Sequence, residues 1–127
     1  MEKVNIKHVN NLHNDWLRAL DFYATELGFM KGRLTEIAGK NTDKEILALV
    51  ERYENQFKIQ KENIDILSHD IRANVSEIAK QAEHSSAGFI DGELLVKHAK
   101  LEKGVMAEEK EVLELRNSFN VFTAKWL

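Results

Sequence analysis

The chain has 127 residues, of which 43% are hydrophobic and 31% are charged, and its formal net charge is −3. A chain of this length and composition can bury a core of its own, which argues against a disordered segment. Acidic and basic residues alternate without a basic block, so nucleic acid is not an expected partner.

The sequence contains neither cysteine nor proline. The lack of cysteine excludes a disulfide framework and a thiolate metal site. The lack of proline permits long uninterrupted helices, because proline is the commonest cause of a helix break or kink. No segment approaches the length of apolar sequence that crosses a bilayer, and the chain does not begin with an apolar signal segment. We therefore expect no membrane association and a cytoplasmic location.

Two groups of turn-forming residues divide the chain. The first contains Gly39, which we expect to end a helix, and continues into a T-x-x-E capping box that begins at Thr42. The second spans residues 85–92, in which Asp91 is the expected N-cap of the last helix. The sequence therefore predicts three helices, over residues 10–38, 42–83 and 91–127.

Within each predicted helix, apolar residues recur at alternating steps of three and four, which is typical of helices that pack knobs into holes. In the first helix these seam positions are Trp16, Leu20, Tyr23, Leu27, Met30, Leu34 and Ile37. The short connection to the second helix makes the two antiparallel neighbours. We therefore predict an all-α, up-down-up antiparallel bundle of three long helices with coiled-coil-like heptad packing, in one domain spanning residues 1–127.

The predicted helix lengths leave one end of this bundle uncovered. The first helix begins near residue 10, so the second helix beyond about Arg72 would pack only against the start of the third. That end is nevertheless apolar, and an exposed stripe of this kind is an aggregation liability unless another surface covers it. The residues expected there are Val75, Ile78, Ala82, Phe89, Ile90, Leu94, Leu95, His98 and Leu101.

Three arrangements would cover this end. A second copy of the chain would complete a four-helix arrangement as a homodimer, or residues 1–9 would fold back over the stripe, or the second helix would break near Ala73 and Asn74. We favour the homodimer, because nine residues cover only part of the stripe and no turn signal accompanies Ala73 and Asn74. The G-x-x-x-G spacing of Gly28 and Gly32 is consistent with close approach of another helix, or with tolerated surface glycines.

Besides Gln60 and His98, the polar residues at seam positions are His13 and Glu108. When the chain is folded about its two turns, both map to the level of residue 68 on the second helix, beside His69. A buried carboxylate needs a partner, and an imidazole is a suitable one. The sequence therefore predicts that His13, His69 and Glu108 converge, as a hydrogen-bonded layer that fixes register, as a solvated layer where the bundle frays, or as a site for a divalent metal or small ligand.

No motif of a familiar enzyme class is present: the sequence lacks H-E-x-x-H, Walker A, G-x-G-x-x-G and G-x-S-x-G patterns. It also lacks the Glu-x-x-His pairs of ferritin-like di-iron bundles. We therefore predict no catalytic residues. The leading hypothesis is a structural or protein-interaction module that acts as an oligomer. The alternative is a metal-binding helical bundle that uses His13, His69 and Glu108.

Overall fold

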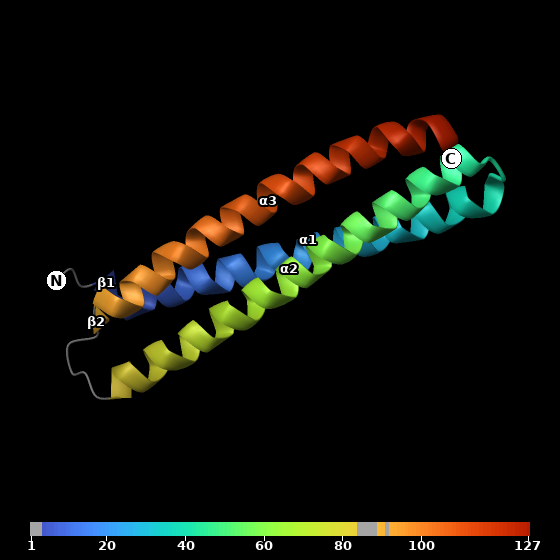
Figure 1. The fold of residues 1–127 in the computed structure, drawn as a ribbon. Helices are drawn as coiled ribbons and strands as arrows, with labels where there is room; N and C mark the ends of the chain where they lie inside the picture. Colours follow the sequence, from blue (N-terminus) through green and yellow to red (C-terminus); the bar gives the residue numbers. More distant parts are fainter. Residues whose placement is uncertain (1–3, 84–88, 91) are drawn as a thin grey trace.

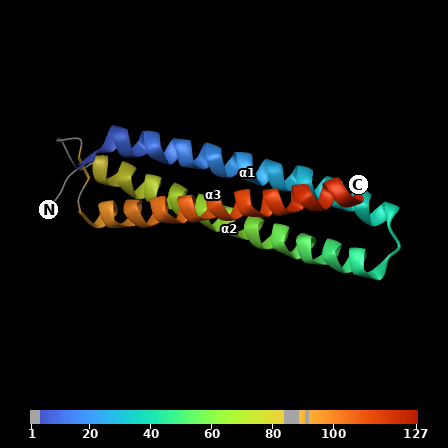
Figure 2. The same ribbon diagram turned by 90° about the horizontal axis from the view of Figure 1, so that it is seen from above.

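The structure is a computed structural model that describes residues 4–83, 89–90 and 92–127. Its three long helices are α1 (Ile6–Lys40), α2 (Lys44–Glu83) and α3 (Gly92–Trp126), and each packs against the other two. Figures 1 and 2 show α2 running antiparallel to both α1 and α3. The predicted all-α, up-down-up bundle of three long helices is confirmed.

The first helix begins four residues earlier than predicted, at Ile6. Asn5 caps it, because its side-chain oxygen accepts a hydrogen bond of 2.9 Å from the backbone N–H of Lys7. The residues before the helix form a two-residue strand, β1 (Val4–Asn5), which pairs antiparallel with β2 (Phe89–Ile90). This pairing fastens the start of α1 beside the segment that leads into α3, as the N-terminal end of the ribbon in Figure 1 shows.

The turn between α1 and α2 lies later than the sequence suggested. Gly39 is still helical, and Asn41, with an extended backbone, is the C-cap of α1. The Asn41 side-chain amide donates to the Ile37 carbonyl oxygen at 2.7 Å and to the Trp126 carbonyl oxygen at 3.4 Å, which ties the turn to the end of α3. Asp43 caps α2 in place of Thr42, since its carboxylate accepts from the Glu45 N–H at 2.8 Å.

The heptad seams of the three helices supply the main core. Phe57 and Phe119 meet edge to face with ring centroids 5.2 Å apart, and Tyr53 and Phe122 complete an aromatic cluster around them. The Tyr53 hydroxyl is hydrogen-bonded to the Ser118 hydroxyl at 2.7 Å. The buried apolar residues of this core are Leu20, Tyr23, Leu27, Met30, Leu34, Ile37, Ile46, Val50, Phe57, Ile64, Ile71, Leu101, Val105, Val112, Leu115, Phe119 and Phe122.

The prediction of an uncovered end was wrong. The extra turn at the start of α1 places Val9 against Ile78 and Leu94, and these three residues form a second, smaller buried cluster. The helix therefore covers the stripe from within the same chain, and β1 adds to the closure. The arrangement that we ranked below the homodimer had residues 1–9 covering the end, and the structure shows Val9 of the described part of this segment in that role. Because α2 continues through Ala73 and Asn74, the broken-helix alternative was also wrong.

The residues that we assigned to a dimer interface accordingly lie within the bundle. Ile78, Leu94 and Leu101 are buried, and Val75, Ala82, Leu95 and His98 are partly buried. Phe89 and Ile90 form β2, and their side chains lie outside the part of the structure that is described. This end of the molecule therefore gives no reason to expect a second copy.

Replacing either of two glycines of α1 with alanine should stabilise the fold. A Cβ added at Gly28 or Gly32 would have no neighbour within 4 Å, so Gly28→Ala and Gly32→Ala should each raise the free energy of unfolding by about 1 kcal/mol. Gly104→Ala should gain less, because its Cβ would lie 2.8 Å from Leu67 Cδ2 and that side chain would have to move. Urea denaturation of the monomeric chain measures all three; a loss of stability at Gly32 would contradict an open helix surface there.

Candidate functional site

The three residues of the predicted metal layer lie in different surroundings. His13 and Glu108 are buried as expected, but His69 is exposed on α2. His13 contacts Asn74, whereas Glu108 interacts with Asn63. Asn63 and Asn74 are eleven residues apart on α2, or about 16 Å at a rise of 1.5 Å per residue. The structure therefore does not bring His13, His69 and Glu108 together.

The register explains the difference. The first turn lies later than we assumed, so His13 meets α2 at Asn74, more than one helical turn beyond the expected level. Glu108 meets α2 at Asn63, more than one turn short of it. Across residues 4–83, 89–90 and 92–127, no three histidine, cysteine, aspartate or glutamate side chains are grouped so that they could hold a metal ion.

Glu108 is a buried carboxyl group in the middle of the α2–α3 contact. Its Oε2 atom is buried without a hydrogen-bond partner. Burial, with a smaller contribution from the neighbouring Glu111 carboxylate, raises the pKa of Glu108 to about 7, against the opposing effect of the hydrogen bond with Asn63. Glu108 is therefore close to half-protonated at neutral pH. It borders a small groove of about 270 Å³ between α2 and α3, which also contains Ile66, Leu67 and Gly104.

His13 belongs to a polar layer that sequence reasoning missed. Its Nε2 atom lies 3.3 Å from Asn74 Nδ2 and 3.3 Å from His98 Nδ1. Trp16 packs on both imidazoles, edge-on to His13 with ring centroids 5.0 Å apart and stacked on His98 at 4.8 Å. His13 and His98 both occupy heptad seam positions, and this was the signal in the sequence. The predicted register placed them at different levels.

The surface between α1 and α3 carries exposed aromatic residues. Phe22 is 55% exposed and Phe29 is 67% exposed, whereas Phe57, Phe119 and Phe122 are buried. Phe22 and Phe29 are separated by one heptad and flank Glu26 at spacings of four and three, so all three lie on one side of α1. Sequence reasoning passed over both phenylalanines, because they are outside the seam.

Two contacts show that this side of α1 faces α3. Glu26 forms an ion pair with Arg116 at 3.6 Å, and Tyr23 interacts with Glu109. On α3, Met106 and Leu113 are exposed and alternate with Glu109 and Arg116 at helical spacings of three and four. Each of the four apolar side chains therefore lies three or four residues from a residue that joins α1 to α3. We call Phe22, Phe29, Met106 and Leu113 the α1/α3 stripe.

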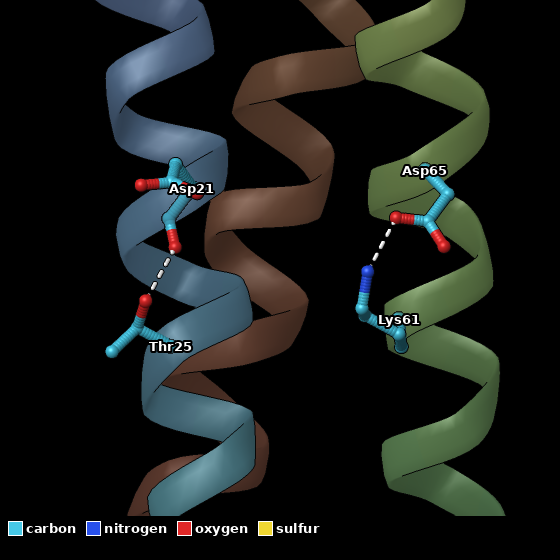
Figure 3. Close-up of polar contacts among 4 residues, drawn as sticks. All are labelled: Asp21, Thr25, Lys61 and Asp65. Carbon is cyan, nitrogen blue, oxygen red and sulfur yellow. Dashed lines mark hydrogen bonds and ion pairs between the residues drawn. The ribbon is translucent and has the colours of Figure 1, made fainter.

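Thr25 lies between the two phenylalanines of the stripe, at steps of three and four from them. Its hydroxyl donates to the Asp21 carbonyl oxygen at 3.0 Å, as Figure 3 shows. Because the hydroxyl is satisfied within its own helix, an apolar surface can cover Thr25 without leaving a donor unpaired. A partner surface can therefore bury this part of the stripe without leaving the Thr25 hydroxyl unpaired.

The groove between α1 and α2 has a different character. It encloses about 450 Å³ above Leu27 and Phe57, and Lys31 and Glu54 are among the charged residues on its walls. A third wall residue, Lys61, forms an exposed ion pair of 2.6 Å with Asp65 on its own helix (Figure 3). A charged wall favours contact with water over docking of an apolar surface. The α1/α3 stripe is thus the better candidate for an interface.

No protein-family model, curated protein or solved structure matches the chain. The choice of a candidate functional site therefore rests on the structure. Within the described parts of the chain, none of the helices combines the length and the apolar character that a membrane span requires.

Proposed function

We propose that this chain is a protein-interaction module that acts as a homodimer, and that the α1/α3 stripe is its interface. The observation that carries the proposal is the exposure of Phe22 and Phe29 beside Met106 and Leu113. Aromatic residues and methionine are enriched at protein interfaces and depleted from surfaces that remain in water. The stripe replaces the apolar end near Leu94 as the reason to expect a second copy.

The arrangement of the stripe favours a second copy as its partner. In a two-fold contact, residue i of one subunit meets residue j of the other, and j meets i. Phe22 and Phe29 lie one heptad apart with Thr25 between them, so antiparallel α1 helices would place Phe22 beside Phe29 of the partner subunit at both ends of the contact. Glu26 and Arg116 already form an ion pair within the chain, so two copies can approach without a concentration of like charge.

The size of the stripe sets the expected strength of the dimer. Apolar patches on monomeric proteins reach about 300 to 600 Å², whereas a stable dimer buries about 800 Å² on each partner. The four side chains of the stripe therefore need the flanking polar residues to complete an interface. We expect a dissociation constant in the micromolar range, since the apolar centre is small and its rim is charged.

Phe22→Glu is expected to weaken dimerisation by more than about tenfold, because a carboxylate would be buried against Phe29 of the partner subunit. The variant should keep the helix content and the unfolding midpoint of the monomer, since Phe22 is 55% exposed in the single chain. Sedimentation equilibrium over a concentration series measures the dissociation constant, and circular dichroism measures the fold. Phe29→Glu should give the same result.

Ile66→Glu is the matched control. Ile66 is 60% exposed, in the groove between α2 and α3, and the substitution adds the same charge. It should leave the dissociation constant unchanged. A wild-type chain that stays monomeric at submillimolar concentration would contradict the homodimer, and equal weakening by Ile66→Glu and Phe22→Glu would contradict the assignment of its interface. The metal-binding alternative has no comparable observation in its favour among the described residues.

A further inference from the structure

The layer of His13, His98, Asn74 and Trp16 separates the two apolar clusters of the bundle. On one side lies the main core, and on the other lies the small cluster of Val9, Ile78 and Leu94. The small cluster is closed over by β1 and β2 and by the partly buried Ile6 and Leu95. The side-chain packing between the small cluster and the main core therefore runs through the histidine layer.

The contacts of this layer favour an uncharged His13. Its Nε2 atom lies 3.3 Å from Asn74 Nδ2, which is a donor, and 3.3 Å from His98 Nδ1, which donates or accepts according to its tautomer. An uncharged Nε2 accepts from Asn74, whereas a protonated Nε2 would turn its N–H towards that donor and leave the Asn74 amide without this acceptor. The Nδ1 atom of His13 is buried without a partner, so the ring has no acceptor there that would stabilise a positive charge.

The charged groups around the layer offer little compensation. His8 on α1 lowers the pKa of His98, as burial does, whereas Glu102 on α3 raises it. On α2 the contacting residue, Asn74, is neutral, while Asp70 and Glu77 line the outer groove beside it together with Lys97 and Lys100 of α3. Glu102 is exposed one turn after His98, so water screens its effect on the buried His13.

Burial and the nearby His98 lower the pKa of His13 to about 4, and burial is also the main cause of the lowered pKa of His98. The unfolded chain binds these protons near pH 6.5, so the folded layer contributes its full stability above that pH and loses it as the pH falls towards 4. Glu108 behaves in the opposite way, because acid removes its buried charge. Lowering the pH therefore destabilises the end of the bundle that contains the histidine layer. Protonation of Glu108, in contrast, removes an unfavourable buried charge between α2 and α3.

We propose that the end of the bundle formed by β1, the first turns of α1, β2 and the start of α3 is an acid-sensitive latch, which opens reversibly on protonation of the histidine layer while the main core stays folded. Opening would expose Val9, Ile78 and Leu94. The latch lies away from the α1/α3 stripe, so the proposal does not depend on the proposed dimer.

The two tryptophans of the chain allow a direct test. In a Trp126→Phe background, Trp16 is the single tryptophan, and a charged imidazole stacked on it should quench its emission. Between pH 7 and pH 4 we expect a reversible change in Trp16 emission with only a small loss of the far-ultraviolet circular dichroism signal. Over the same range, amide protection factors around Val9 and Leu94 should fall at least tenfold, and those around Phe119 should not change.

His13→Gln removes the titrating group but keeps an acceptor near the position of Nε2. It should lower the midpoint of the transition by about one pH unit or more, and His98→Gln should lower it in the same direction. His69→Gln is the matched control, because His69 is exposed on α2 and should leave the midpoint unchanged.

The outcomes separate the latch from ordinary acid unfolding. Simultaneous loss of protection around Val9 and Phe119 would overturn the proposal, and so would a midpoint that His13→Gln and His98→Gln leave unchanged. A wild-type chain without any transition down to pH 4 would overturn it as well. If His13→Gln does not fold at pH 7, the protection factors of the wild-type chain and the midpoint of His98→Gln decide.

Discussion

Glu108→Gln is expected to raise the free energy of unfolding by about 3 kcal/mol at pH 8. The wild-type carboxylate is charged at that pH, 3% exposed, and has one oxygen without a partner. Glutamine has the same shape, keeps an oxygen for the hydrogen bond with Asn63, and carries no charge. The replacement therefore removes the desolvation of a buried charge with little change in packing.

The gain should depend on pH in a defined direction. The pKa of Glu108 rises from 4.5 to about 7 on folding, so the folded chain holds the proton more tightly between these values. Stability associated with the protonated carboxyl group is present below pH 4.5 and is lost as the pH rises through 7. The difference between Glu108→Gln and wild type should therefore fall from about 3 kcal/mol at pH 8 to about 1 kcal/mol or less at pH 5.

Urea denaturation of both proteins at each pH measures this difference. The contributions of His13 and His98 are common to the two proteins and cancel in the comparison. Glu114→Gln serves as the control, because Glu114 is an exposed carboxylate on the same helix and should change stability only slightly at either pH. A Glu108→Gln protein that gains the same amount at pH 5 and pH 8 would show that the effect does not come from the buried charge.

Phe119→Ala is expected to cost about 3 to 5 kcal/mol of unfolding free energy, because a large buried side chain is replaced by a cavity. Phe119 is fully buried and its ring contacts those of Tyr53, Phe57 and Phe122. Loss of the ring removes apolar burial and three aromatic contacts at once. For a domain whose total stability is about 5 to 15 kcal/mol, this change brings the fold close to its limit.

Phe29→Ala is the matched control for this substitution. The chemical change is the same, but Phe29 is 67% exposed, so its removal from the monomer should cost less than about 0.5 kcal/mol. Thermal and urea unfolding at a concentration where the chain is monomeric compare the two variants. Equal losses at the two positions would contradict the burial pattern on which both the core and the α1/α3 stripe rest.

The class of fold and the positions that face the core follow from the pattern of apolar residues in the sequence. The heptad spacing of residues such as Leu20, Ile64 and Val112 predicts which side of each helix is buried, and these residues are buried. The same spacing identified His13 and Glu108 as polar residues within the seam, and both are buried as well. Periodicity succeeds here because burial follows from the side of the helix on which a residue lies.

The residues that meet across the helices could be identified only once the helices were placed against one another. A heptad seam is unchanged when one helix slides by seven residues, so periodicity leaves the register open. The register follows from the caps at Asn5, Asn41 and Asp43 and from side-chain packing, and it placed His13 with Asn74 and His98. The α1/α3 stripe depended on the structure for the same reason. Phe22 and Phe29 lie outside the seam, and the contact between Glu26 and Arg116 showed that they border α3.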